Sequence, residues 1–261
     1  MKLSDIILYT DVDGTAIYYH KQISQKNTEA IHELINKGGL FGVASGRTRK
    51  SIIPLFPDVN MPYIEANGAI VYDPADKMEL CHTLLYYEFK KRIYEFIKNQ
   101  SSLKLTALTD NTKIVQMDDV RDYEPSKYEI LKPCDFLNSD VAKCAVISDR
   151  TILDKAVEQL IKSDILNGTS YARSDAEYFE IFNLGTNKGT GIQKAISHRK
   201  LTGKILVCVG DSQNDIEMLN NADIALCPDN AIPDVKSICT KILPHCKRDT
   251  LYYAVKYLKG I

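Results

Sequence analysis

The chain has 261 residues, of which 44% are hydrophobic and 26% charged, and its formal net charge is −1. This is the composition of a globular protein with enough residues for one large or two modest domains. The balanced charge argues against a general nucleic-acid-binding surface, and no apolar run approaches the roughly 18 residues of a membrane span.

The N-terminal part predicts strands that alternate with helices. The apolar run at 6–10 is typical of a buried parallel strand, and a helix is expected over 24–36 with Ser24 as its N-cap. Two more strands are expected at 40–44 and 63–66. We interpret all three strands as parts of βα units in one parallel sheet.

The middle of the chain has a different pattern. The elements predicted there are helices at 88–97 and 152–162 and strands at 103–108, 113–117, 144–148, 169–172 and 178–182. This order favours an α+β module with a mainly antiparallel sheet. The chain is expected to cross between modules near 82–84 and 183–187.

The C-terminal part returns to the first pattern. The elements predicted there are helices at 190–198, around 216–219 and at 250–258, and strands at 205–209 and 224–227. The predicted fold class is therefore α/β. A parallel-sheet core is expected from 1–81 and 186–261, with an inserted α+β domain at 82–185.

The seven cysteines and the first residues together predict a cytoplasmic protein. The cysteines are odd in number and scattered, with no C-x-x-C pair, and Cys208 is one of several within apolar runs. Buried reduced thiols are expected rather than disulfides or a zinc site. Residues 1–5 lead directly into the first strand, which leaves no room for a signal peptide.

Two carboxylates, Asp11 and Asp13, follow the first predicted strand. Open α/β sheets bind ligands at the carboxyl ends of their strands, and residues i and i+2 of an extended chain point to the same side. One carboxylate can therefore attack while the other transfers protons, and the pair can share a hard cation. The alternative is an ordinary Asp-Gly turn.

Three further polar motifs follow other predicted strands or precede a helix. The hydroxyl of Ser45 and the N–H groups of its turn with Gly46 suit phosphate oxygens, although Ser45 could instead cap a helix. Lys188 can neutralise a phosphoryl group or a carboxylate, but such a lysine is usually only solvated. Asp211 and Asp215 lie one helical turn apart and can face one point. Mg²⁺ prefers such oxygen ligands.

The four motifs occur in the order found in the haloacid dehalogenase (HAD) superfamily, and the resemblance covers essentially the whole chain. The residues that carry it are Asp11, Asp13, Gly14, Thr15, Ser45, Lys188, Gly210, Asp211, Asn214 and Asp215. Three further features resemble the Cof-like sugar-phosphatase branch: the long insertion, the segment Ser45-Gly46-Arg47 and the segment Asn67-Gly68-Ala69. The resemblance implies a Rossmann-like core with an inserted α/β cap domain.

The resemblance also implies a role for each residue. Asp11 would be the nucleophile, Asp13 the general acid and base, and Mg²⁺ would be held by Asp11, the Asp13 carbonyl and Asp211. The phosphate-binding residues would be Ser45, Gly46, Lys188 and Asn214, with Gly14, Thr15 and Asp215 in support. The expected substrate contacts are Arg47, Asn67 and Arg173.

The predicted activity is Mg²⁺-dependent hydrolysis of small phosphorylated metabolites, with sugar phosphates the first choice, through an aspartyl phosphate. The alternatives are a hexose phosphomutase and a catalytically silent regulatory protein. A mutase would need a basic cluster in the cap, whose cations are scattered in the sequence: Lys90, Lys91, Arg92, Lys127 and Arg173. Neither a nucleic-acid nor a membrane partner is expected, and the oligomeric state is left open.

Overall fold

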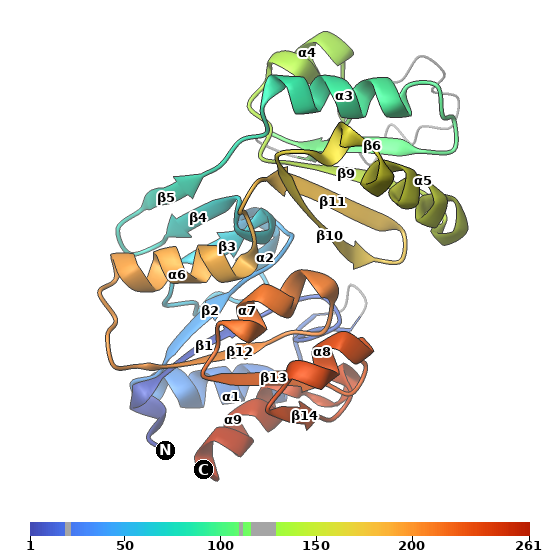
Figure 1. Ribbon diagram of the computed structural model, residues 1–261. Helices are drawn as coiled ribbons and strands as arrows, with labels where there is room; N and C mark the ends of the chain where they lie inside the picture. The colour runs from blue at the N-terminus through green and yellow to red at the C-terminus, as the bar shows by residue number, and fades with distance from the viewer. Residues whose placement is uncertain (19–21, 110–111, 116–128) are drawn as a thin grey trace. The chain divides into compact units, whose positions relative to one another are not determined.

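A computed structural model describes residues 1–18, 22–109, 112–115 and 129–261 of the chain. The chain divides into two compact units: a core unit, Met1–Cys81 with Asn187–Ile261, and an inserted unit, His82–Thr186 (Figure 1). All seven cysteines are free thiols, and four of them are buried. Within the described ranges, no helix is both long and apolar enough to cross a membrane.

The core unit is built on a parallel sheet with the strand order β14-β13-β12-β1-β2. Its strands are β1 (Ile6–Thr10), β2 (Leu40–Val43), β12 (Ile205–Val209), β13 (Ile224–Pro228) and β14 (Lys241–Leu243). Its helices are α1 (Gln25–Asn36), α2 (Arg49–Ile52), α6 (Lys188–His198), α7 (Ile216–Asn220), α8 (Pro233–Ile238) and α9 (Thr250–Lys259). The expected strands at 6–10 and 205–209 are confirmed, while β14 and α8 were not predicted.

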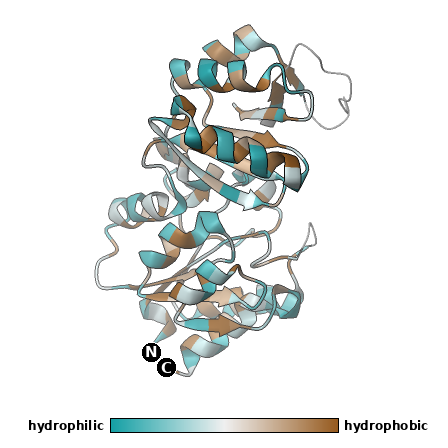
Figure 2. Cartoon of the chain, turned by 45° about the vertical axis from the view of Figure 1, so that its right-hand side comes forward, coloured by the Kyte–Doolittle hydropathy of each residue, from teal (hydrophilic) through white to brown (hydrophobic). Residues whose placement is uncertain are grey.

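The interior strand β1 is buried on both faces, which explains its uninterrupted apolar sequence. Ile6 and Leu8 belong to an apolar cluster with residues of α1 and α9. Ile7 and Tyr9 belong to a second cluster with residues of α6 and α7. Figure 2 shows the matching bands of hydrophilic and hydrophobic residues along the helices. The predicted cap of α1 is confirmed, because Ser24 accepts a hydrogen bond from the Asn27 N–H.

A second sheet corrects the prediction for 63–66. This segment was expected to be a βα unit of the parallel sheet. β3 (Tyr63–Glu65) does form a parallel bridge beside β2, between Ala44 and Ile64, but it pairs antiparallel with β4 (Ile70–Asp73) and no α-helix follows it. The order of this sheet is β3-β4-β5, with β5 at Met78–His82. The physical reason is the turn at Ala66–Gly68, whose positive φ angles send the chain back along β3 instead of into a helix.

The inserted unit contains a sheet with the strand order β10-β11-β9-β6-β7-β8. Its strands are β6 (Lys104–Leu108), β7 (Thr112–Val115), β8 (Glu129–Leu131), β9 (Lys143–Ile147), β10 (Thr169–Asp175) and β11 (Tyr178–Asn183). Among the described strand pairs of this sheet, only β7–β8 is parallel, so the predicted mainly antiparallel sheet is confirmed. The helices are α3 (Tyr87–Ile97), α4 (Pro133–Asn138) and α5 (Arg150–Lys162). Residues of all three helices pack with alternate strand residues in one apolar cluster.

Candidate active site

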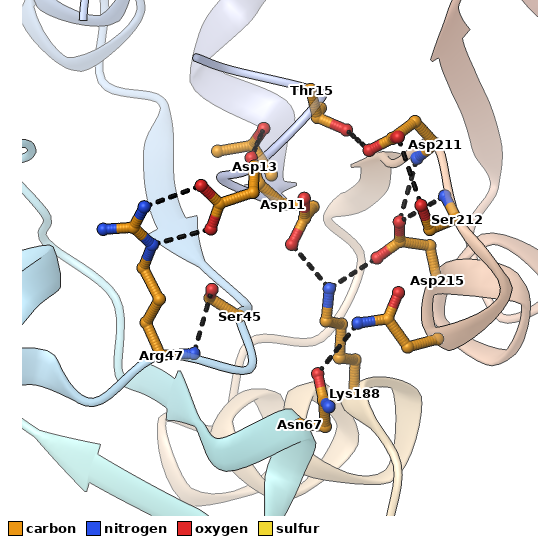
Figure 3. A network of polar contacts seen from close by, with 12 residues as sticks. Asp11, Asp13, Thr15, Ser45, Arg47, Asn67, Lys188, Asp211, Ser212 and Asp215 are labelled. Carbon is orange, nitrogen blue, oxygen red and sulfur yellow. Dashed lines mark hydrogen bonds and ion pairs between the residues drawn. The ribbon is translucent and has the colours of Figure 1, made fainter. Parts of the chain in front are cut away.

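The carboxyl ends of β1, β2 and β12 lie side by side and present polar residues at one edge of the core sheet. Thr10, the last residue of β1, is in register with Val43 of β2 and Val209 of β12. The pairing continues one residue further, because the Asp11 N–H donates to the Val209 carbonyl at 2.8 Å. The loops that follow these strands therefore start at the same level, as expected for an open parallel sheet (Figure 3).

Lys188 lies between two buried carboxylates. Its Nζ is 2.6 Å from Asp11 Oδ1 and 2.6 Å from Asp215 Oδ1. The side chains of Lys188 and Asp215 are 0% exposed and that of Asp11 is 8% exposed. Burial opposes the lysine's charge, but the two carboxylates outweigh burial and raise the pKa of Lys188. The simple alternative, a solvated lysine, is therefore wrong.

The start of α6 explains how Lys188 is held. Asn187 is the N-cap, and its side chain accepts a hydrogen bond from the Thr190 N–H at 2.8 Å. The Asn187 N–H donates in turn to the Thr190 hydroxyl, which completes a capping box. The signal for this cap is visible in the sequence as an Asn three residues before a Thr.

Asp11, Asp211 and Asp215 form a buried acidic cluster whose ligand oxygens lie within 4.8 Å of one another. Thr15 Oγ1 donates to Asp211 Oδ1 at 2.6 Å, and Ser212 Oγ donates to Asp211 Oδ2 at 3.2 Å. Burial, with the nearby Asp215 charge, raises the pKa of Asp211 to about 7. Burial also raises the pKa of Asp11, although Lys188 opposes that effect.

The donor chemistry of this cluster fits Mg²⁺. Asp215 uses one oxygen for Lys188 and accepts the backbone N–H groups of Asp211 and Ser212 with the other, at 2.8 and 2.9 Å. Asp215 is thus suited to hold the loop rather than to bind a metal directly. Asp11 and Asp211 supply the hard carboxylate oxygens that Mg²⁺ prefers, and burial, with the neighbouring carboxylates, raises the pKa of both groups.

Asp13 is oriented differently from Asp11. Its carboxylate is 48% exposed and accepts two hydrogen bonds from Arg47, at 2.6 Å from Nε and 2.6 Å from Nη2 (Figure 3). The bonds to Asp13 outweigh partial burial and raise the pKa of Arg47. The bidentate pair fixes the direction of the Asp13 carboxylate. Arg47, expected as a substrate contact, contacts a proposed catalytic residue in this structure.

The Ser45 loop packs against the turn that contains Asn67. Ser45 is buried, and its Oγ accepts a hydrogen bond from the Arg47 N–H at 3.2 Å instead of capping α2. Gly46 lies between these two residues, half-buried. Asn214 Nδ2 donates to Asn67 Oδ1 at 3.1 Å. Asn67, expected as a substrate contact, thus contacts a predicted phosphate-binding residue.

The loop after Asp13 is fitted closely around Asp211. Gly14 has a φ of +79°, and a Cβ at this position would lie 2.5 Å from Asp211 Oδ2, so no side chain fits there. Asn230 Nδ2 donates to the Gly14 carbonyl at 2.7 Å. Asn230 was not predicted as a site residue, because its contact with Gly14 joins positions far apart in the sequence.

Arg173 lies outside this group, in β10 of the inserted unit. Its guanidinium forms an ion pair with Asp154 of α5 and donates to the carbonyls of Asp175 and Ala176. These contacts lie within the inserted unit and lend no support to the expected substrate contact. Every other predicted site residue belongs to the core unit.

Comparisons with known proteins find relatives along most of the chain. A family model of haloacid dehalogenase-like hydrolases matches residues 8–255. The chain is 24% identical over 278 residues to the 5-amino-6-(5-phospho-D-ribitylamino)uracil phosphatase YwtE of Bacillus subtilis, covering 95% of this chain and 96% of that protein. The solved structure of the HAD subclass IIB sugar phosphatase BT4131 covers 98% of this chain and 99% of its own, with a TM-score of 0.81 and 19% identity. This likeness shows a shared fold.

Another relative is longer than this chain. The chain is 22% identical over 256 residues to the chloroplastic endoribonuclease YBEY of Arabidopsis thaliana. The match covers 90% of this chain but only 43% of that protein.

Proposed function

Because the chain belongs to the haloacid dehalogenase-like hydrolases, we propose that it is a Mg²⁺-dependent phosphatase of small phosphorylated metabolites. The observation that carries the proposal is the buried ion pair of Lys188 with Asp11, beside the separately held Asp13. In this proposal the core unit contains the catalytic site, and the inserted unit is the cap domain that the resemblance implies.

In the first step, an Asp11 carboxylate oxygen attacks phosphorus. Lys188 holds Oδ1 of Asp11 and favours the ionised, nucleophilic carboxylate despite its burial. A bond forms between Asp11 and phosphorus while the ester P–O bond breaks. Asp13 gives its proton to the leaving oxygen, so the alcohol departs neutral and an aspartyl phosphate remains.

In the second step, water hydrolyses the aspartyl phosphate. Asp13 takes a proton from the water as the water oxygen bonds to phosphorus, and the bond from phosphorus to Asp11 breaks. Inorganic phosphate leaves, and both carboxyl groups return to their first states. The bidentate contact with Arg47 aims the ionised Asp13 carboxylate in one direction, which is the form that takes the proton from water in this second step.

The phosphoryl group is held by residues of three loops in this proposal. Ser45 with the adjoining Gly46 N–H, Lys188 and the Asn214 amide supply donors of the kind that phosphate oxygens accept. Asp11 and Asp211, with the Asp13 carbonyl, would hold Mg²⁺. When bound, Mg²⁺ supplies positive charge that offsets the charge of the phosphoryl group.

Two relatives support a polyol or sugar phosphate as the substrate class. YwtE is named for a 5-phospho-D-ribitylamino compound, and BT4131 is a sugar phosphatase. Both descriptions include a small polyhydroxylated phosphate ester. We infer the same class for this chain, with sugar phosphates first.

The mutase alternative receives less support from the inserted unit. Lys90 is buried and donates to the Ser139 carbonyl at 2.6 Å. Arg92 donates to the Asp164 carbonyl at 2.8 Å, and Arg173 pairs with Asp154. Lys127 lies outside the described residues. The contacts of Lys90, Arg92 and Arg173 are thus structural bonds within the unit, and we favour hydrolysis.

The test is phosphate release from sugar phosphates, nucleotides and cofactor phosphates, with Mg²⁺ and with EDTA. We expect Mg²⁺-dependent release that is lost in Asp11→Asn and kept in Asp58→Asn, a control at an exposed carboxylate of the same unit. Near-normal release in Asp11→Asn, or release that EDTA does not affect, would refute the proposal. Conversion of hexose 1-phosphate to 6-phosphate without net phosphate release would favour the mutase.

A further inference from the structure

The turn between β3 and β4 has an unusual backbone. Ala66, Asn67 and Gly68 have φ angles of +47°, +55° and +96°, and all three residues are buried. Alanine and asparagine adopt positive φ at a cost in free energy, and such strain persists where surrounding contacts enforce it. The turn between β4 and β5 contains one such residue, Lys77 at +54°. A change of chain direction therefore does not by itself require three.

The turn contacts the Ser45 loop through its backbone. The Asn67 N–H donates to the Ser45 carbonyl at 2.9 Å, and the Ala66 N–H donates to the Arg47 carbonyl at 3.1 Å. The turn thus holds the loop from which the Ser45 hydroxyl is presented.

The same turn contacts the loop before Lys188. Gly68 lies so close to Asn187 that a Cβ on the glycine would be 2.2 Å from the Asn187 carbonyl oxygen. It would also lie 3.4 Å from the Lys188 nitrogen. Only glycine fits this approach.

A third contact joins the turn to Asn214. Asn67 Oδ1 accepts one hydrogen of the Asn214 amide at 3.1 Å. An amide nitrogen has two hydrogens, so this bond leaves the second one for a phosphoryl oxygen and fixes the direction in which it points. One turn therefore contacts the three loops that carry Ser45, Lys188 and Asn214.

We propose that Asn67 is a positioning residue that orients the Asn214 amide for a phosphoryl oxygen. The proposal rests on the proposed function for the role of Asn214. Asparagine suits the position for two reasons: it tolerates a left-handed backbone, and it offers a neutral acceptor oxygen beside the acidic cluster. Glycine would keep the backbone but lose the acceptor. Aspartate would keep the acceptor but add a negative charge near the bound phosphate.

The experiment compares Asn67→Gly, Asn214→Ala and the double variant in the Mg²⁺-loaded protein. Binding of inorganic phosphate is measured by calorimetry, and kcat and KM are measured with a hydrolysed phosphate ester. We expect Asn67→Gly to weaken phosphate binding by about three- to tenfold, the effect of one neutral hydrogen bond. In the Asn214→Ala background, the same change should have no further effect, because Asn67 acts through Asn214.

Lys200→Gly is the matched control. Lys200 also has a positive φ, +52°, but it is exposed in the loop after α6. Removing its side chain changes a left-handed residue to glycine outside the site, and phosphate binding should stay unchanged. Additive losses in the double variant, or unchanged phosphate binding in Asn67→Gly, would overturn the proposal.

The outcomes also separate this proposal from the proposed function. A protein that binds phosphate with the expected coupling but hydrolyses no ester would keep the role of Asn67 and refute the phosphatase. If the protein is an active phosphatase but the losses of phosphate binding in Asn67→Gly and Asn214→Ala add up in the double variant, only the role of Asn67 is refuted. A protein that neither binds phosphate nor hydrolyses an ester would refute both.

Discussion

Asp211→Asn is expected to stabilise the metal-free protein. Asp211 is a buried carboxylate in an acidic cluster, and burial and Asp215 raise its pKa. Asparagine has nearly the same shape. It keeps the acceptor for Thr15, and its amide can donate to Ser212, whose hydroxyl can rotate to accept. The substitution therefore removes a charge from the cluster without removing its packing.

The magnitude follows from the pKa of Asp211, which rises from 3.8 to about 7 on folding. Each tenfold change in proton affinity corresponds to about 1.4 kcal/mol, so ionised Asp211 costs the native state about 4 kcal/mol at pH 8. The native protein binds this proton more tightly than the unfolded chain. Stability is therefore lost as the pH rises from about 4 through about 7. The advantage of asparagine should fall below about 2 kcal/mol at pH 5.

The assay is urea unfolding with EDTA at pH 5 and pH 8. Asp229→Asn is the control, because the side chain of Asp229 is 68% exposed, and it should change the free energy of unfolding little. Added Mg²⁺ should stabilise the wild type more than Asp211→Asn, since the variant lacks a ligand. A variant no more stable than the wild type at pH 8, or a difference equal at both pH values, would refute the reasoning.

Three other predictions concern ion pairs of the core unit. Lys188→Met leaves two buried carboxylates unpaired and should lower the free energy of unfolding by about 3 to 5 kcal/mol. An unchanged midpoint in urea unfolding would contradict this prediction. Arg47→Lys keeps the charge but loses the two-bond contact with Asp13, so kcat should fall by about tenfold with a smaller change in KM. If the variant has the kcat and KM of the wild type, the bidentate contact between the Arg47 guanidinium and Asp13 is not needed. Asp73 is buried, but Arg199 and backbone N–H groups outweigh burial and lower its pKa. The stabilisation from ionised Asp73 is present above the ordinary pKa of the group and is lost as the pH falls below about 4. Acid should therefore lower the thermal unfolding temperature of the wild type more than that of Asp73→Asn. Equal decreases in the two proteins would contradict the lowered pKa of Asp73.

Many of the elements, and the polar motifs that follow the strands, could be predicted from local sequence. The apolar run at 6–10 is buried on both faces of its sheet, as its composition predicts. Ser24 caps α1 by accepting a hydrogen bond from the Asn27 N–H, three residues along the chain. Hydrophobic periodicity and caps act over a few residues, so they can be recognised without a tertiary structure. The position of Asp11 after a buried strand was predictable for the same reason.

The partners of the charged residues were decided only by the tertiary structure. Lys188 contacts Asp11 across 177 positions of the chain, a pairing that depends on how α6 meets the end of β1. Arg47 pairs with Asp13 because β1 and β2 end at the same level, although the sequence suggested a substrate contact. Arg173 pairs with Asp154 within the inserted unit.

The turn at 66–68 shows the same division. An Asn-Gly dipeptide is typical of a turn, but the three positive φ angles and the contact with Asn214 arise from packing against loops distant in the chain. Sequence by itself determined which residue types follow the strands of this protein. Sheet register and loop packing decided which of them touch, because a side chain's partner depends on contacts between distant segments and not on its neighbours in the chain.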